Sequence, residues 1–110
     1  MIQPAIKRGS AELAVLSVLA EAPLHGYEMA RRIEERTGGV LRFTLASLYP
    51  LLYRLERRGS VAGEWKTGPN GRQRRYYRLT PRGRRQLGPL REQWRRYVEA
   101  LRRLPGLADA

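Results

Sequence analysis

Cysteine is absent from the 110-residue chain, and histidine and aspartate occur once each, as His25 and Asp109. The absence of cysteine excludes disulfides, thiolate chemistry and cysteine-ligated zinc. A general acid–base site would have to be built from scattered glutamates, because no carboxylate pair stands in a motif. We therefore expect neither an enzyme nor a metal or other cofactor.

Long apolar runs are also missing. No run reaches the roughly 18 residues needed to span a bilayer, and the first residues do not read as a signal peptide. Apolar residues still make up 42% of the chain, which is enough for it to fold rather than stay disordered. The expectation is one folded unit in the cytoplasm, with no membrane partner.

Acidic residues are scarce beside basic ones, 10 against 22, which leaves a net charge of +12. The positive electrostatic field of such a chain attracts polyanions, so the candidate partners are nucleic acid, an anionic membrane surface or an acidic protein. All basic residues but Lys7 and Lys66 are arginine, whose flat fork of donors suits phosphate and guanine edges. Codon bias in a GC-rich genome explains the same enrichment equally well.

The first third of the chain predicts two helices. Residues 1–9 are expected to be a short arm, and residues 10–22 form a helix that is apolar on nearly every side and therefore buried. A second helix is predicted over residues 25–37, with His25 in a structural role at its start. Its inward-facing residues are predicted to be Tyr27, Ala30 and Ile33.

The third helix has one apolar stripe, because four leucines recur at i, i+3, i+4 and i+7. They are Leu48, Leu51, Leu52 and Leu55. Pro50 belongs in the first turn, which places the helix start near Ala46 or Ser47, and Gly59 marks the end. The opposite face carries Tyr49, Pro50, Tyr53, Arg54 and Arg57. An exposed face of aromatics and arginines is more than solubility requires.

Residues 61–79 change from a helical period to strict alternation around a Gly-Pro-Asn-Gly turn at 68–71. This pattern predicts a two-stranded hairpin with a basic tip. Tyr77 is expected to face the core beside Trp65. The residues expected to point outward are Arg74 and Tyr76.

The last helix is predicted to open at Thr80-Pro81, an N-cap followed by proline at the first helical position. Its apolar residues are spaced 3, 4, 3, 4 and 3 apart, the a/d pattern of a helix packed along another helix. We expect a kink at Gly88-Pro89 and a homodimer that covers this seam. The predicted dimerisation residues are Leu87, Leu90, Trp94, Tyr97, Leu101 and Leu104.

Three helices, a basic hairpin and one long extra helix, in that order, describe a mainly α fold. We interpret it as a winged helix-turn-helix over residues 1–80, followed over residues 81–110 by a C-terminal dimerisation helix and tail. A helix fits the major groove of double-stranded DNA, and arginines of a hairpin suit the neighbouring backbone or minor groove.

At these residues the sequence resembles the PadR family of transcriptional regulators, in its short subfamily with a single terminal helix. The resemblance covers roughly residues 10 to 104. It departs at Ala46-Ser47, where the family often has Gly-Thr, and at Gly88-Pro89. The segments that carry it are LHGYEMARRIEERTGG, SLYPLLYRLERRGSV, RRYYRLTPRGRRQL and the helix that holds Trp94.

The resemblance implies a repressor whose third helix and wing bind operator DNA, with contacts at Tyr49, Pro50, Arg54 and the wing arginines. It also implies that paired Trp94 side chains, with Tyr97 nearby, hold a planar hydrophobic effector, although dimer packing alone would explain Trp94. The full set of predicted DNA-binding residues is Thr44, Ser47, Tyr49, Pro50, Tyr53, Arg54, Arg57, Lys66, Arg72 and Arg74.

Two other function classes stay open at this point. The apolar seam suits a protein-binding module in which the charge is incidental. A basic RNA-binding module is the other alternative, although no glycine-aromatic RNP motif is present and the one Gly-x-x-Gly segment, residues 68–71, is the predicted hairpin turn.

Overall fold

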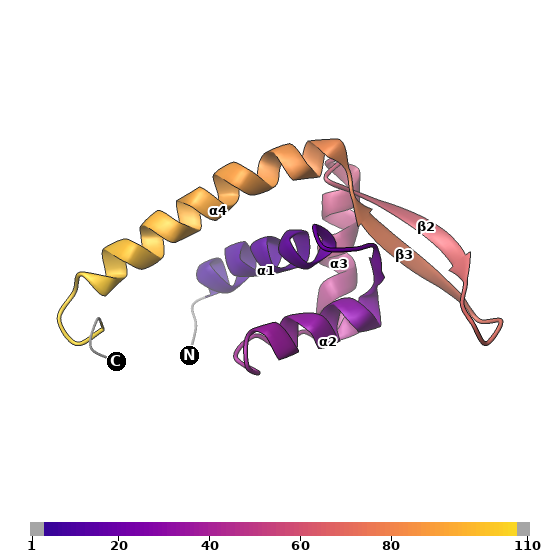
Figure 1. The fold of residues 1–110 in the computed structure, drawn as a ribbon, viewed down its shortest axis with the longest axis horizontal. Helices are drawn as coiled ribbons and strands as arrows, with labels where there is room; N and C mark the ends of the chain where they lie inside the picture. Colours follow the sequence, from indigo (N-terminus) through magenta and orange to yellow (C-terminus); the bar gives the residue numbers. More distant parts are fainter. Residues whose placement is uncertain (1–3, 108–110) are drawn as a thin grey trace.

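The computed structural model describes residues 4–107. Two parts project from the body formed by the first three helices: a hairpin at one end and a long helix at the other (Figure 1). The molecule is therefore elongated, with extents of 54 × 27 × 22 Å. The helices are α1 (Pro4–Leu19), α2 (Gly26–Arg36), α3 (Leu45–Arg57) and α4 (Pro81–Arg102), and the strands are β1 (Leu24–His25), β2 (Val61–Thr67) and β3 (Gln73–Leu79).

Helix α1 lies at the centre, as its apolar sequence predicts. Val15 and Leu16 are fully buried, and α1 contacts both α2 and α4. Its start was predicted wrongly: residues 4–9 belong to the helix and do not form an arm, whereas residues 1–3 lie outside the described part. The helix also ends at Leu19, a turn before the predicted end.

Helix α2 buries Ile33 as predicted, but the rest of its buried face differs from the predicted one. Gly26, Met29 and Ile33 recur at i, i+3 and i+7 and are buried, whereas Ala30 only partly packs on the core. Tyr27 stands about 100° around the helix from Gly26 and is 59% exposed, so its predicted core position is wrong. The helix ends at Arg36, followed by Gly38 and Gly39, both in the left-handed region that favours glycine.

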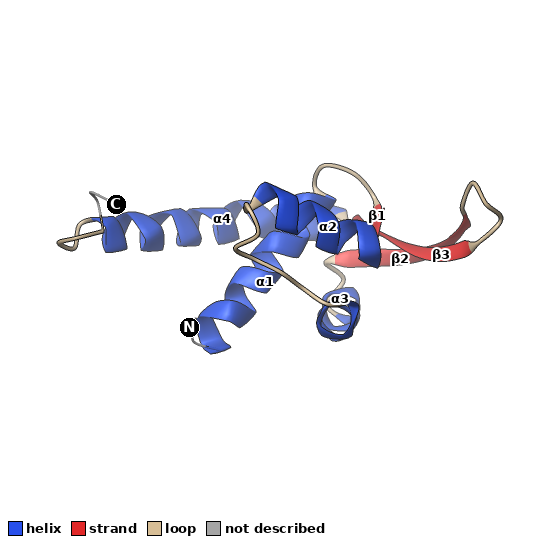
Figure 2. Ribbon diagram, turned by 90° about the horizontal axis from the view of Figure 1, so that it is seen from below, coloured by secondary structure: helices blue, strands red, loops and turns tan. Residues whose placement is uncertain are grey.

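Helix α3 follows the sequence prediction closely. It begins at Leu45, one residue before the predicted start, and its four leucines are all buried. Pro50 is the sixth residue of the helix, so it lies in the second turn and not in the first turn as predicted. The helix therefore lacks the hydrogen bond that an N–H at this position would donate. Gly59 ends the segment with a φ of 78°. In Figure 2, α3 is seen end-on at the margin of the molecule, so one of its sides faces outward.

The hairpin is part of a three-stranded antiparallel sheet in the order β1-β3-β2. The two-residue strand β1 was not predicted. Tyr77 is buried as expected, but Trp65 is 62% exposed, which corrects its predicted place in the wing core. Trp65 shares the inward parity of Tyr77, yet it pairs with Arg75 where the strands have already extended beyond the helices.

Helix α4 begins as predicted, since the Thr80 hydroxyl accepts the N–H of Gly83 at 3.0 Å. It is continuous through Gly88-Pro89 and curves in Figure 1 without breaking. Leu87 is 3% exposed and belongs to the core of its own chain, with Leu90 packed beside it. Leu87 is therefore a core residue, a different role from the predicted one between two chains.

Candidate nucleic-acid interface

The N-terminus of α3 is fixed by two hydroxyl side chains. The Thr44 Oγ1 atom accepts the N–H of Ser47 at 3.2 Å, and the Ser47 hydroxyl donates to the Thr44 carbonyl oxygen at 2.9 Å. Such a cap satisfies one of the free N–H groups of the first turn. Both residues are exposed. The remaining N–H groups and the helix dipole make this end suitable for an anion such as a phosphate.

The outward face of α3 carries aromatic and basic side chains. Tyr53 is 62% exposed, and the Arg57 guanidinium lies 5.7 Å from the centre of its ring. Arg54 is also exposed. Within residues 4–107 neither Arg54 nor Arg57 forms an ion pair. Their charges are thus available to a partner on the side opposite the buried leucines.

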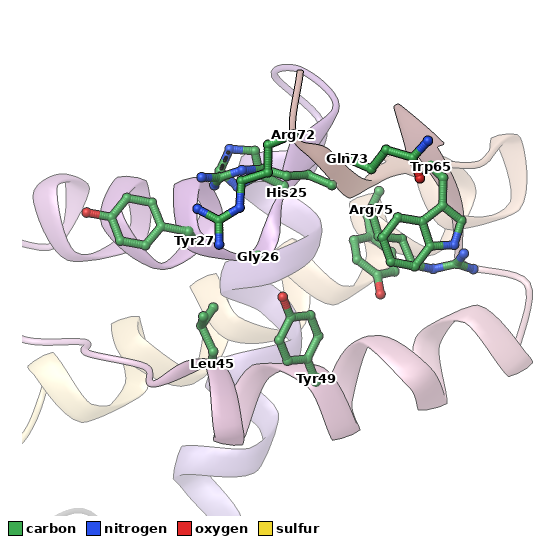
Figure 3. A pocket seen from close by; sticks show the side chains of 11 residues that line it. His25, Gly26, Tyr27, Leu45, Tyr49, Trp65, Arg72, Gln73 and Arg75 are labelled. Carbon is green, nitrogen blue, oxygen red and sulfur yellow. Dashed lines mark hydrogen bonds between the residues drawn. The ribbon is translucent and has the colours of Figure 1, made fainter. Parts of the chain in front are cut away.

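Tyr49 points along the protein surface instead of straight outward. A methyl group placed on Gly26 would lie 3.2 Å from the Tyr49 hydroxyl, so this ring lies against the start of α2. Figure 3 shows it rising from α3 toward a groove of about 680 Å³. No carboxylate lines this groove, which runs between α3 and the wing. The lining residues are His25, Gly26, Tyr27, Leu45, Tyr49, Trp65, Arg72, Gln73, Arg74, Arg75 and Tyr77.

The wing, defined here as β2, β3 and their turn, presents basic side chains on its outer face. The Lys66 ammonium lies 5.8 Å from the Tyr76 ring centre. Arg74 and Tyr76, predicted to point outward, are half-buried because His25 of β1 lies beside them. Arg72, at the end of the turn, is exposed. From Leu45 to Leu79 the chain carries eight Lys or Arg and two Glu, so α3 and the wing form a basic surface.

His25 has the structural role that was predicted, and it has a second contact. Its Nδ1 accepts the N–H of Glu28 at 3.3 Å, which caps α2. Its Nε2 lies 3.4 Å from Arg74, but a neutral imidazole cannot accept at both nitrogens. Burial and the Arg74 charge lower the pKa of His25, while Glu28 opposes this shift. The fold therefore favours the neutral imidazole of His25 over the charged one.

The distal part of α4 and the segment after it expose an apolar stripe along the chain. Trp94 is half-buried, and its ring meets that of Tyr97 edge-on at 5.8 Å. The exposed members are Tyr97, Val98, Leu101, Leu104 and Leu107. A methyl group on Gly9 would lie 3.2 Å from the Trp94 ring, so part of this indole packs against α1 of its own chain.

Three residues at the junction of α3 and the wing were missed by the sequence reasoning: Glu56, Gly63 and Arg75. The Glu56 carboxylate accepts from both the Gly63 N–H and the Arg75 guanidinium. Two signals were available. Glu56 is the only acid in α3, and the alternation that places Tyr77 inward places Arg75 on the same face.

No helix within residues 4–107 is both long and apolar enough to cross a membrane. In the same part of the chain, no three His, Asp or Glu side chains come together as a group that could hold a metal ion.

Comparison with known proteins identifies the family. The sequence pattern of the Transcriptional regulator PadR-like family matches residues 15–89. A transcriptional regulator from Clostridium thermocellum is 26% identical, with a TM-score of 0.82 over 96% of this chain and 99% of that one. A PadR family transcriptional regulator from Eggerthella lenta is 35% identical, with a TM-score of 0.71 over 88% and 79%. The predicted resemblance and the winged-helix fold are thus confirmed: the chain belongs to the PadR-like family of transcriptional regulators.

Proposed function

We propose that the protein is a sequence-specific DNA-binding regulator in which α3 enters the major groove and the wing rests on the adjacent backbone. The observation that carries the proposal is the outward face of α3, where Tyr53, Arg54 and Arg57 stand exposed and free of ion pairs within residues 4–107. A major groove accommodates one α-helix and presents a distinct pattern for each base pair. Membership in a family of transcriptional regulators supports the same conclusion.

Within this proposal the residues divide by what they contact. Arg54 reads a base edge, and the exposed hydroxyls of Thr44 and Ser47 lie where a phosphate would approach the start of α3. The wing contributes backbone contacts, which position the protein without reading sequence. The residues assigned to DNA are Thr44, Ser47, Tyr49, Pro50, Tyr53, Arg54, Arg57, Lys66, Arg72 and Arg74.

The functional unit in this proposal is a homodimer held together by residues 81–110, with residues 1–80 as the DNA-binding part. Its support is the exposed stripe of Tyr97, Leu101 and Leu104, because monomers rarely leave a contiguous apolar patch in water. Light scattering should give twice the chain mass of 12.7 kDa. A monomer at micromolar concentration would remove this part of the proposal.

A dimer with two-fold symmetry should bind an inverted repeat whose half-sites lie about one helical turn apart, or a multiple of it. The test is selection from a random pool of double-stranded DNA, followed by affinity measurements on the enriched sequence. Enrichment of an inverted repeat is expected. No enrichment, or equal binding to single-stranded RNA, would favour a general basic module instead.

Variants then separate base reading from phosphate binding. Arg54→Ala should lose about 1–3 kcal/mol of discrimination at particular base pairs. If Arg54 contacts only phosphate, affinity should fall evenly across sequences. Arg72→Ala and Arg74→Ala should each lower the salt slope of log affinity by about 0.9. A salt slope that is unchanged in the double variant would remove the wing from the interface.

The proposal extends to a repressor released by a planar hydrophobic effector that binds at Trp94 and Tyr97. Exposed aromatic surface supports it, whereas the packing of Trp94 on Gly9 favours a structural role. Titration of planar aromatic compounds in a Trp65→Phe background isolates the Trp94 fluorescence. Unaltered ligand binding in an intact Trp94→Ala dimer would show that Trp94 only packs. In transcription assays, the dimer should lower transcription from a template bearing the selected site, and the ligand should restore it.

A further inference from the structure

Glu56 stands where a carboxylate is unfavourable in two ways. It is the only acidic residue of α3 and lies in the last turn, where the helix dipole disfavours negative charge. It also lies on an element of the basic surface described above, where it opposes the attraction of a polyanion. Its side chain is about one-third exposed, so it is neither a core residue nor a freely solvated one.

The contacts of Glu56 join α3 to both strands of the wing. One oxygen, Oε2, accepts the Gly63 N–H of β2 at 3.2 Å and lies 2.7 Å from the Arg75 guanidinium of β3. Strand β2 is an edge of the sheet, and edge strands carry N–H groups that no neighbouring strand can satisfy. Glu56 therefore satisfies an edge N–H and an arginine with a single atom.

Gly63 and the aromatic rings of the wing determine the path of Arg75. A methyl group on Gly63 would lie 2.6 Å from the Arg75 Nε atom, so the guanidinium lies directly across the backbone of β2. Its carbon is 5.8 Å from the Trp65 ring centre and 5.7 Å from that of Tyr77. A planar guanidinium fits such a site better than an ammonium would. Arg75 thus lies across the wing with its charged end directed at Glu56.

We infer that Glu56, Gly63 and Arg75 form a bracket that sets the position of the wing relative to α3, and that Glu56 is a positioning residue for DNA binding. The inference rests on the proposed function, because it requires α3 and the wing to contact one DNA duplex together. A wing fixed by this bracket presents Arg72 and Arg74 at the backbone while α3 lies in the groove. A wing without it samples orientations in which only one of the two elements fits.

The direction in which one substitution changes DNA affinity tests the inference. Glu56→Gln removes a negative charge, so simple attraction between charges predicts tighter DNA binding. The bracket predicts weaker binding, because the wing loses one or two phosphate contacts. One phosphate contact with a salt slope of about 0.9 raises DNA affinity roughly fivefold at 0.15 M salt. Losing one or two such contacts should therefore weaken DNA binding about five- to thirtyfold.

Glu64→Gln is the matched control. It makes the same charge change on β2, but Glu64 is exposed and pairs in register with Tyr76, on the face of the sheet away from Arg75. It should leave the affinity for the selected duplex unchanged or raise it. Gly63→Ala leaves every charge in place but displaces Arg75, and it should weaken binding as Glu56→Gln does. The double variant Glu56→Gln/Arg75→Gln should bind no more weakly than Arg75→Gln alone, since each substitution removes the same bracket.

Two further readouts complete the test. In free protein, hydrogen exchange of the Gly63 amide should speed up in Glu56→Ala and stay unchanged in Glu64→Gln, whatever happens to DNA binding. In the Glu56→Gln background, Arg72→Ala should cost less affinity than in the wild type. If wild type binds the selected duplex specifically and Glu56→Gln binds it as tightly as Glu64→Gln does, the inference is wrong and the proposed function stands. If wild type shows no sequence preference, the proposed function itself fails.

Discussion

Two glycines of α4 allow the packing of this helix to be tested by one substitution with different expected outcomes. Gly83 packs against Ser60, which precedes the wing in sequence. The Cβ of an alanine at Gly83 would overlap the Ser60 carbonyl oxygen and lie 2.8 Å from the Leu79 side chain. Gly88 lies five residues further along the same helix, and apart from its chain neighbours Leu87 and Pro89 no side chain of a described residue lies within 4 Å of the same position. Gly83→Ala and Gly88→Ala make the same chemical change in one helix, but the new methyl group meets the Ser60 backbone at the first position and only the ring of the next residue, Pro89, at the second.

The magnitudes follow from helix propensity and overlap. Replacing glycine by alanine inside a helix gains about 1 kcal/mol. At Gly88 the ring of Pro89 opposes part of that gain, because a residue with a Cβ is crowded when it precedes proline in a helix. At Gly83, α4 must move away from Ser60. The Ser60 carbonyl oxygen accepts from the Thr80 N–H at 3.1 Å and from the Thr80 hydroxyl at 3.0 Å. The Ser60 hydroxyl donates to the Gln86 side chain at 2.5 Å. Overpacking together with weakened hydrogen bonds outweighs the propensity gain and should leave a net loss of about 2 kcal/mol.

Thermal unfolding followed by circular dichroism measures both effects. For a chain of this size 1 kcal/mol corresponds to about 4–8 °C. Gly88→Ala should therefore change Tm by no more than that amount, whereas Gly83→Ala should lower it by about 8–16 °C. All samples need the same chain concentration, because the stability of a dimer depends on it. If Gly83→Ala lowers Tm no more than Gly88→Ala does, α4 does not pack on Ser60 as described.

Three further outcomes are expected. Because the pKa of folded His25 is lowered by burial and then by Arg74, the folded state takes up its proton less readily than the unfolded state. The stability that depends on neutral His25 is therefore present above pH 6.5 and lost as the pH falls below this value. Urea titrations should show this loss of stability in wild type but not in His25→Asn, in which asparagine still caps α2. Leu52→Ala should cost about 2–5 kcal/mol in the same assay, since Leu52 is fully buried. Arg58→Ala should change stability by less than about 1 kcal/mol, because its bridge to Glu12 is solvent-exposed.

Elements with a single periodic stripe could be predicted from the sequence. The four leucines define α3 because nothing competes with their period, and the Thr80-Pro81 pair marks the start of α4 through a local hydrogen bond. The parity of Tyr77 was also predictable, because alternation fixes which side a strand residue faces. How deeply each residue along the strand is buried could not be predicted in the same way. Trp65 has the inward parity, but whether a strand still lies over the helices at that point depends on tertiary geometry.

Other misses have similar physical causes. Strand β1 has two residues, too few to show a period, and it forms only because Leu24 and His25 pair with β3. The bracket at Glu56 joins residues 7 and 19 apart in sequence, and no local pattern reports such contacts. Leu87 fits the heptad spacing, but spacing cannot distinguish a seam against the same chain from a seam against a second one.

The proposed recognition of one DNA sequence by α3 and the wing together is tested by the ratio of two dissociation constants at about 0.15 M salt. One constant is measured for the selected duplex and the other for a duplex of the same composition in shuffled order. Specific DNA-binding proteins bind their sites about 10³-fold or more tightly than other DNA, and a ratio of that order is predicted here. A ratio near one, with both affinities falling equally with added salt, would show that this basic surface binds DNA without reading it.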